Sequence, residues 1–292
     1  MLFGVIGTLL RQLKYRVNKA ILSGELGNGV PNRLYIIKEI VLDKDLEIIR
    51  NRILEFSIIV NIFEKDFAKP MMYDSGIEHF GFRYTNTSAK HFCVLKMFRV
   101  ISGLNACVVL AEKSYIQEIC VLIRSIIEGL SHVEYVLSGY NNGEIKEKQK
   151  LFVDKFFSDF QRNSRDDYPK GPLRRQGKIH KEVGNFLDDE ISSTEFSDKY
   201  KEVSAKELMS NVYGAFSNYV HARYPEIMDM YGGSPGHFHL NGMSGTPKDS
   251  ECVDIITCFM DSTSLVLGRM IEEFGMVEKM INIDRLAHWF RK

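Results

Sequence analysis

The stretch 116–137 carries polar residues along one edge of an otherwise apolar sequence. Arg124 and Glu128 are four residues apart, and His132 and Tyr135 continue the same edge over the next two helical turns. An arginine and a glutamate at this spacing commonly form a solvated ion pair that contributes little to stability. Four functional side chains in line also suit one wall of a polar cleft, in which a guanidinium can bind a phosphate.

A second group lies in the sequence YGAFSNYVHARYP at residues 213–225. Ser217 and Asn218 precede His221 by four and three residues, so all three share one face of a helix. Apolar residues lie between them and are expected to turn toward the core: Phe216, Tyr219 and Val220. A lone helical histidine is more often a structural residue, whereas a serine and an asparagine beside it favour a polar cleft.

Basic residues are concentrated between positions 162 and 181. Seven lysines and arginines stand there against two acids, in a chain whose 38 basic and 38 acidic residues balance. Such a loop can bind phosphates through counterion release, with Tyr168 available for base stacking. The alternative is a solvated loop whose charge is balanced by the acids at 188–190. The candidate RNA-binding residues are Arg162, Arg165, Lys170, Arg174, Arg175 and Lys178.

The histidines in the sequence GHFHLNG, His237 and His239, invite a comparison with metal sites. Alternate residues of an extended segment point the same way, but zinc needs one or two further ligands. Asp229, His221 or Cys252 can supply them, although no spacing in the sequence specifies which. The motifs of nucleotide-dependent, oxidoreductase and zinc-protease chemistry (a P-loop, GxGxxG after a strand, HExxH) do not occur. The sequence therefore predicts no bound metal and no cofactor.

The spacing of apolar residues predicts helices along most of the chain, and strand-like alternation is rare. Residues 34–67 predict one long amphipathic helix, or two helices broken near Asp43. The stretch 69–86, which contains proline and glycine, predicts a loop and a domain boundary. Thr87 or Ser88 can then cap a helix that runs to about residue 111 and carries small residues in its middle.

Two capping boxes mark the helices that carry the candidate site. Ser114 with Gln117 begins a helix that ends near 137, and Ser204 with Glu207 begins a helix that Pro225 ends or kinks. The other expected segments are a helix over about 144–162, an irregular stretch over 163–203, a loop over 231–247, a long helix from Asp249 or Ser250, and a docking helix at the C-terminus.

The chain has 292 residues, of which 45% are hydrophobic, 26% charged and 11% aromatic. This composition favours a packed protein over a disordered, collagen-like or disulfide-stabilised one. The five cysteines lie in apolar helical patterns without a CxxC pair, which favours reduced thiols in a cytoplasmic protein. We expect an all-α protein with an N-terminal helical region, residues 1–85, followed by a helical bundle, residues 86–292.

The first ten residues, MLFGVIGTLL, are apolar and are followed by Arg11, Lys14, Arg16 and Lys19. A secretory signal places its positive charges before the apolar run, and here they follow it. We favour a short helix that docks on the body of the protein. An amphipathic helix on a membrane surface is the alternative. No apolar run approaches the 18 or so residues that a spanning helix needs.

The helix with Arg124 and Glu128, followed by the FSNYVHA helix, resembles the HEPN superfamily of bacterial four-helix-bundle domains. The resemblance covers about residues 88–275 and is to a branch with one RxxxE and one SxxxH helix. It implies an up-and-down bundle and a homodimer whose paired helices form one cleft. Many HEPN proteins are metal-independent endoribonucleases of toxin–antitoxin and anti-phage systems, so the resemblance implies an RNA-directed protein of bacterial toxin or antiviral defence.

The family motif is an arginine, four to six residues, and then a histidine, and only His221 matches it. A phenylalanine, an alanine and a glycine occupy the positions of the arginine (216, 215 and 214), whereas Asn218 occupies a position that is often polar in the family. Metal-free cleavage of RNA needs a base for the 2′-hydroxyl proton and a cation for the charge on the phosphate. His221 is the candidate base, and Arg124 or Arg223 is the candidate cation. The candidate catalytic residues are His221, Arg124, Glu128, Asn218, Ser217 and Arg223.

The missing motif arginine leaves a second function open. A non-catalytic helical module that senses or binds a protein partner from the same defence system fits the same sequence. In that case the N-terminal region, residues 1–85, is the candidate docking element.

Overall fold

The computed structural model describes residues 32–74, 80–141, 143–158, 176–192, 204–231, 237–246 and 248–289. Within these ranges the chain is mostly helical, which confirms the expected all-α helical bundle. The expected docking segment at the N-terminus, residues 1–22, lies outside the described residues.

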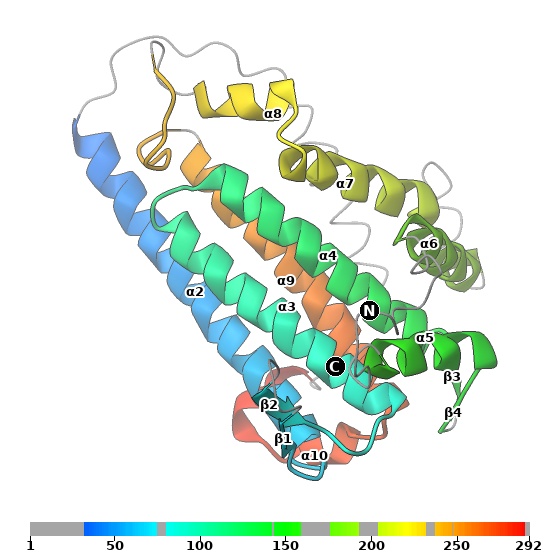
Figure 1. The fold of residues 1–292 in the computed structure, drawn as a ribbon. Coiled ribbons are helices and arrows are strands. Elements are labelled where there is room, and N and C mark those ends of the chain that lie inside the picture. Colours follow the sequence, from blue (N-terminus) through cyan, green and yellow to red (C-terminus); the bar gives the residue numbers. More distant parts are fainter. Residues whose placement is uncertain are drawn as a thin grey trace.

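Four long helices form the bundle: α2 (Asn32–Glu64), α3 (Ala89–Ala111), α4 (Ile116–Leu137) and α9 (Lys248–Glu273). They close a ring in which α2 packs on α3, α3 on α4, α4 on α9, and α9 on α2 (Figure 1). One continuous core fills the ring, and α2 contributes buried apolar residues to it, as the later helices do. The expected boundary near residue 85 therefore separates two segments that share a core. α2 is a single helix without a break at Asp43.

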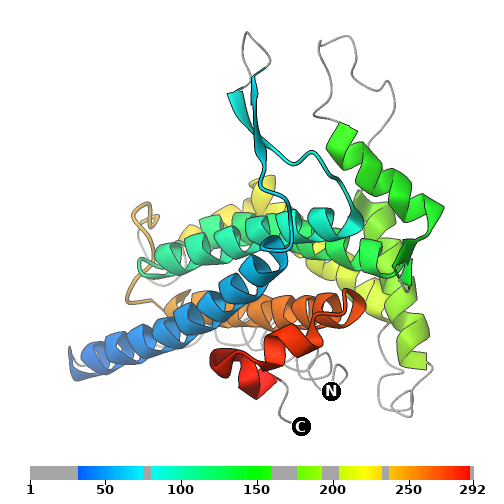
Figure 2. The same ribbon diagram turned by 90° about the horizontal axis from the view of Figure 1, so that it is seen from below.

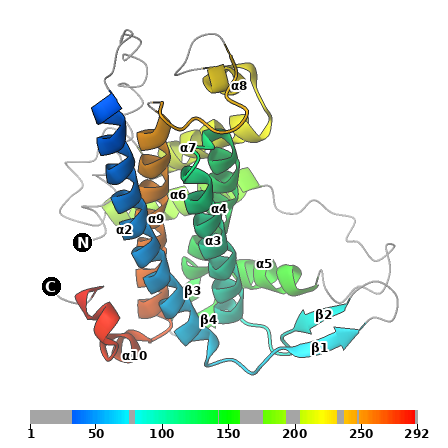
Figure 3. The same cartoon turned by 90° about the vertical axis from the view of Figure 1, so that its left-hand side faces the viewer.

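Three of the four long helices run in the same direction. Ser114, just before α4, donates a hydrogen bond to Asp249 in the first turn of α9. Near the other ends, Glu134 of α4 pairs with Arg269 of α9, so the two helices are parallel. α2 also runs parallel to α9 (Figure 3). The up-and-down order that the resemblance implies holds for α2, α3 and α4 but not for α9, because the excursion through 138–247 returns the chain to the end where α4 begins.

Glycines allow α3 and α4 to approach closely. A Cβ atom on Gly129 of α4 would lie 2.7 Å from Val100 Cγ2, and one on Gly103 of α3 would lie 3.0 Å from Ile126 Cγ1. The small residue Gly103 in the middle of α3 thus lets α4 pack close to it. The apolar face expected on α4 is fully buried. It consists of Ile116, Ile119, Cys120, Ile123, Ile127, Leu130, Val133 and Leu137.

The expected helix caps are confirmed at two of the three serines. The Ser88 hydroxyl accepts a hydrogen bond from the His91 amide at 3.3 Å, and the Ser204 hydroxyl accepts one from the Glu207 amide at 3.1 Å. The prediction at Ser114 is wrong. Its hydroxyl is bonded to Asp249, and its backbone has a φ of 52°.

The segment between α2 and α3 forms a hairpin where the sequence predicts a loop. Strands β1 (Met71–Asp74) and β2 (Phe80–Arg83) pair antiparallel with Met72 opposite Phe82. The hairpin projects from the bundle (Figure 3). A stretch this short, with two glycines nearby, lacks the length of alternating pattern that identifies a strand from sequence.

The excursion between α4 and α9 is largely helical, although the sequence predicts an irregular stretch over 163–203. It starts with a small hairpin, β3 (Tyr140–Asn141) and β4 (Glu144–Ile145), and continues through helices that cover α4 (Figures 1 and 2). These helices are α5 (Glu147–Ser158), α6 (Gln176–Ser192), α7 (Ala205–Val220) and α8 (Tyr224–Met228). Pro225 does not end α7 but lies in the first turn of α8.

The C-terminal segment packs on the bundle as the sequence predicts. It consists of α10 (Val277–Ile281) and the 3-10 turn η4 (Asp284–Trp289). Leu286 is buried, and the Trp289 ring meets the Phe56 ring edge-on with centroids 5.9 Å apart. Among the described helices, α3 has a length and an apolar composition that would suffice to cross a membrane, and half of that stretch is buried in the core.

Candidate functional site

The structure brings Arg124 of α4 against Ser217 of α7. The Arg124 Nε donates a hydrogen bond of 2.9 Å to the Ser217 hydroxyl, across 93 residues of sequence. On its own helix the Arg124 guanidinium lies 2.6 Å from a Glu128 carboxylate oxygen. This pair is more buried than an ordinary surface ion pair, since only 16% of the Arg124 side chain is exposed. The two motif helices predicted from the sequence therefore meet at these residues.

Tyr213 is a member of the site that the sequence analysis did not single out. Its hydroxyl accepts a hydrogen bond from Arg124 Nη2, and the guanidinium carbon lies 3.6 Å from the centre of its ring. A cation over an aromatic face is stabilised by the ring quadrupole. Tyr213 precedes Ser217 by four residues, so the spacing alone predicts that the two share a helix face.

His221 lies at the C-terminal end of α7, one turn beyond Ser217. Its amide donates to the Ser217 carbonyl at 3.1 Å, and its side chain is exposed. Arg223 follows in the same turn, is exposed, and its amide donates to the Asn218 carbonyl at 3.2 Å. The hydrogen bonds described for the Arg124 side chain lead to Glu128, Ser217 and Tyr213, and His221 is not among them.

A lysine from α3 adds a second charge beside the Arg124 pair. The Lys96 ammonium lies 4.8 Å from the centre of the Phe156 ring and 5.4 Å from that of Phe92. Burial lowers the pKa of Lys96, and the Glu128 carboxylate opposes that shift. Glu128 therefore interacts with two cations, one from α4 and one from α3.

A second polar cluster joins α7 to the start of α9. The Tyr219 hydroxyl donates to Asp229 at 2.9 Å, and Lys248 of α9 lies 3.8 Å from Asp229 and 2.8 Å from Glu251. Burial is the main cause that raises the pKa of Tyr219, with Asp229 adding to it. Burial opposes the charge on Lys248, but Glu251 and Asp229 outweigh it and raise its pKa. Tyr219 thus stays protonated and Lys248 charged at neutral pH.

The polar edge of α4 does not continue along one cleft. Tyr135 is buried and its ring meets the Phe152 ring at 5.3 Å, while the His132 ring meets the same ring at 5.2 Å. Tyr135 packs with Ile179 of α6 in a small second core. The second half of the edge therefore packs under α5 and α6, and the first half faces α7.

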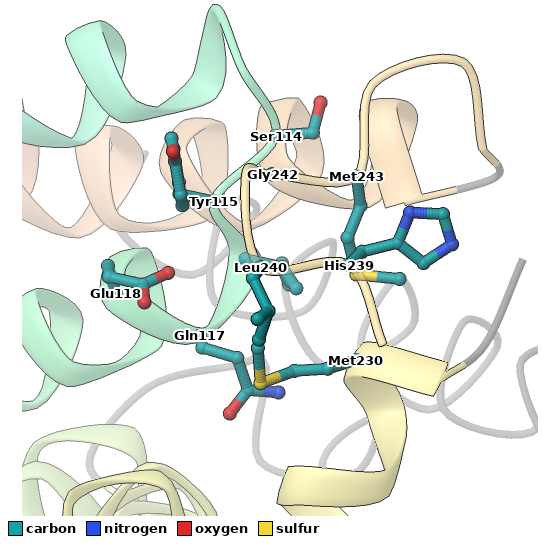
Figure 4. A pocket seen from close by; sticks show the side chains of 10 residues that line it. Ser114, Tyr115, Gln117, Glu118, Met230, His239, Leu240, Gly242 and Met243 are labelled. Carbon is teal, nitrogen blue, oxygen red and sulfur yellow. The ribbon is translucent and has the colours of Figure 1, made fainter. Parts of the chain in front are cut away.

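His237 and His239 lie close together, with ring centroids 4.6 Å apart. Within the described residues, no group of three or more histidine, cysteine, aspartate or glutamate side chains could hold a metal ion. His239 lines a cavity of about 10 Å³ at the corner between α3 and α4, together with Gln117 and Met230 (Figure 4). A cavity of this size has room for about one water molecule.

The cysteines among the described residues are free thiols, and all but Cys258 are buried. Burial raises the pKa of the Cys107 and Cys252 thiols to about 12, so neither forms a thiolate nucleophile at neutral pH. The site therefore contains an imidazole and guanidinium groups but no reactive cysteine.

The basic stretch is described only in part. Five candidate RNA-binding residues lie outside the described residues: Arg162, Arg165, Lys170, Arg174 and Arg175. Lys178 lies on α6, a helix that packs against α7 and α4.

Known proteins do not supply an assignment for this arrangement. No family model matches the chain, and no curated protein and no solved structure matches it significantly.

Proposed function

We propose that the protein is an RNA-directed, HEPN-like endoribonuclease that needs no metal and acts in a bacterial toxin or antiviral defence setting. The observation that carries the proposal is the 2.9 Å hydrogen bond between Arg124 and Ser217, which joins the RxxxE helix to the SxxxH helix. One turn further, His221 and Arg223 are both exposed. An accessible imidazole and an accessible guanidinium two residues apart supply the two groups that metal-free RNA cleavage needs.

In this proposal His221 removes the proton from a 2′-hydroxyl group. The 2′-oxygen attacks the adjacent phosphorus, and the bond to the 5′-oxygen of the next nucleotide breaks as that oxygen takes up a proton. Arg223 stabilises the charge that develops on the phosphate, because its side chain is exposed whereas Arg124 is already bound by three residues. Arg124 is then a positioning residue that fixes α7, and Asn218 is half-buried beside the base.

The test is cleavage of total bacterial RNA by the purified protein in the presence of EDTA. We expect products with 2′,3′-cyclic phosphate and 5′-hydroxyl ends. His221→Ala and Arg223→Ala should abolish cleavage, because each removes one of the two groups. His237→Ala, which removes an exposed imidazole from another loop, is the matched control and should cleave normally. Equal cleavage by His221→Ala and the unchanged protein, or cleavage that stops in EDTA, would contradict the proposal.

We also propose that the protein binds RNA as a cytoplasmic homodimer through the basic stretch 162–181. α6 carries the end of that stretch, packs against α7 and has Lys181 exposed. A phosphate contact made by these residues should weaken with salt, since counterions are released on binding. Light scattering gives the number of chains, and RNA binding measured over a range of salt concentrations tests the contact.

The second candidate function is a non-catalytic module that binds a protein partner. Two observations favour it: the Arg124 guanidinium is bound within the fold, and the β1–β2 hairpin exposes apolar side chains. Met71 and Met72 are each 62% exposed and Phe82 is 64% exposed. Absence of RNA cleavage, together with a partner complex that survives His221→Ala and is lost in Met72→Ser/Phe82→Ser, would favour this function over the first.

A further inference from the structure

A groove of about 530 Å³ lies where α2, α9 and the C-terminal turn η4 meet. Figure 3 shows α2 and α9 side by side above the C-terminal segment. One wall is the side chain of Trp289, the single tryptophan of the chain. The other wall is a stripe of α2 residues that are three and four positions apart: Ile48, Asn51, Arg52 and Glu55.

The polar groups of this groove already have partners within the fold. Arg52 binds Asp261 at 2.7 Å and Ser264 at 2.9 Å. Glu55 accepts a hydrogen bond from Trp289 Nε1 at 3.1 Å and lies 3.3 Å from His288. What the groove offers a further occupant is therefore apolar surface, above all Ile48, which is 65% exposed. Such a surface fits apolar side chains rather than a charged small molecule.

We propose that this groove binds residues 2–22 of the same chain. Apolar residues recur in that segment at helical spacing, at positions 3, 6, 10, 13 and 17. The residues that join it to α2, 23–31, include glycine, serine, asparagine and proline, which are typical of turns. The sequence thus predicts a helix with an apolar stripe over residues 2–22 and a turn over 23–31. Both come immediately before α2, which forms one wall of the groove.

The length of the segment matches the position of the groove. Ile48 lies 16 residues after the start of α2 at Asn32, which is about 24 Å along the helix. A helix that runs back along α2 from residue 22 brings Ile6 to the level of Ile48 and Phe3 to the level of Asn51.

Disulfide trapping tests the proposed register directly. We expect Ile6→Cys/Ile48→Cys to form a disulfide within one chain under mild oxidation, in a Cys258→Ser background that removes the partly exposed native thiol. The matched control is Ile6→Cys/Leu151→Cys, because Leu151 on α5 is 60% exposed but lies away from the groove. Equal rates for the two pairs would overturn the proposal.

Fluorescence of Trp289 tests occupancy without a crosslink. An apolar helix over the groove shields the indole from acrylamide, so Ile6→Asp should raise the quenching constant. Gln12→Asp changes a residue outside the apolar stripe and should leave that constant unchanged. An identical constant for Ile6→Asp and the unchanged protein would count against an occupied groove.

Two other occupants give different results. Disulfides that form only between two chains would assign the groove to the segment of a second copy and overturn the intramolecular proposal. Flotation of the chain with anionic vesicles, lost on deletion of residues 2–22 and accompanied by no groove-specific disulfide, would assign the segment to a membrane surface instead. None of these readouts depends on RNA, so the proposal stands or fails separately from the proposed function.

Discussion

Ala222 closes α7 in a backbone conformation that glycine favours. Its φ is 46°, its amide donates to the Tyr219 carbonyl at 3.1 Å, and the next amide, of Arg223, donates to the Asn218 carbonyl at 3.2 Å. These two bonds form a Schellman motif, in which the left-handed residue is usually glycine. An alanine in this conformation costs about 1–2 kcal/mol. The strained residue lies between His221 and Arg223, the two exposed residues of the proposed site.

Replacing Ala222 by glycine should therefore stabilise the protein. Relief of the left-handed strain outweighs the extra backbone entropy that glycine has in the unfolded chain, and we expect a net gain of about 0.5–1 kcal/mol. Urea unfolding measures the gain as a higher midpoint at an unchanged slope. Ala215→Gly, at an exposed position inside α7, is the control and should destabilise by about 1 kcal/mol. A loss of stability in both variants would refute the assignment of strain to Ala222.

Residue spacing predicted which residues share a helix face at the candidate site, but not the contacts between helices. The interval of four residues placed Arg124 with Glu128 and Ser217 with His221, because helix geometry alone determines which residues share a face. It could not show that Arg124 is bound by Tyr213, or that Lys248 lies beside Asp229. Those contacts join helices that are far apart in sequence, and their pairing depends on how the helices pack.

At the scale of elements, the loop 237–246 is fixed to the corner between α3 and α4. The Met243 amide donates to the carbonyls of Lys113 and Ser114 at 3.1 and 3.2 Å. Gly242 makes this approach possible, since its φ is 88° and a Cβ atom there would lie 1.9 Å from the Lys113 carbonyl oxygen. Both the backbone conformation and the space exclude a side chain at this position.

Gly242→Ala should destabilise the protein by about 2 kcal/mol or more, because strain at a positive φ adds to displacement of the backbone. Gly143→Ala separates the two contributions, since Gly143 has a φ of 91° but nothing within 4 Å of its Cβ position. The control should lose only about 1 kcal/mol. Thermal or urea unfolding compares the two variants. Equal losses would show that the contact with Lys113 contributes nothing.

The same corner explains why one capping box was predicted wrongly. Ser114 with Gln117 and Ser204 with Glu207 are similar patterns, and only the second caps a helix. Tyr115 occupies the cap of α4 and makes no side-chain cap bond. The Ser114 hydroxyl instead binds Asp249, and the Gln117 amide donates to the Glu226 carbonyl at 2.5 Å. Partners more than 100 residues away decide between the two outcomes, and a local pattern does not contain them.

For the molecule as a whole, the helical class was predictable and the helix directions were not. The apolar periodicity of α2, α4 and α9 identifies each as a helix, because each buries one side in a common core. The direction of α9 depends on where the excursion through α5, α6, α7 and α8 ends. That excursion returns to the corner at Ser114, and the contact between Ser114 and Asp249 lies there.

Asp66 joins three parts of the bundle at its opposite end. It follows α2 and accepts hydrogen bonds from Lys279 of α10 at 2.7 Å and Lys90 of α3 at 3.1 Å. The hydrogen bond from Lys279 is the main cause that lowers the pKa of Asp66; burial opposes it and Lys90 adds to it. A carboxyl whose folded pKa is lowered stabilises the fold above its unfolded pKa of about 3.9, and this stabilisation disappears as pH falls through the folded value.

Asp66→Asn should therefore lower the free energy of unfolding at pH 7 by about 1 kcal/mol or less, since the side chain is one-third exposed. It should also flatten the dependence of stability on pH below about 4, where the unchanged protein loses this contribution. Urea unfolding at a series of pH values from 7 to 2 measures both effects. Asp154→Asn removes a carboxylate whose ion pair stays within α5, so it should leave stability at pH 7 nearly unchanged. If the free energy of unfolding of Asp66→Asn changes with pH in the same way as that of the unchanged protein down to pH 2, the charge of Asp66 does not stabilise the contact between α10 and the bundle.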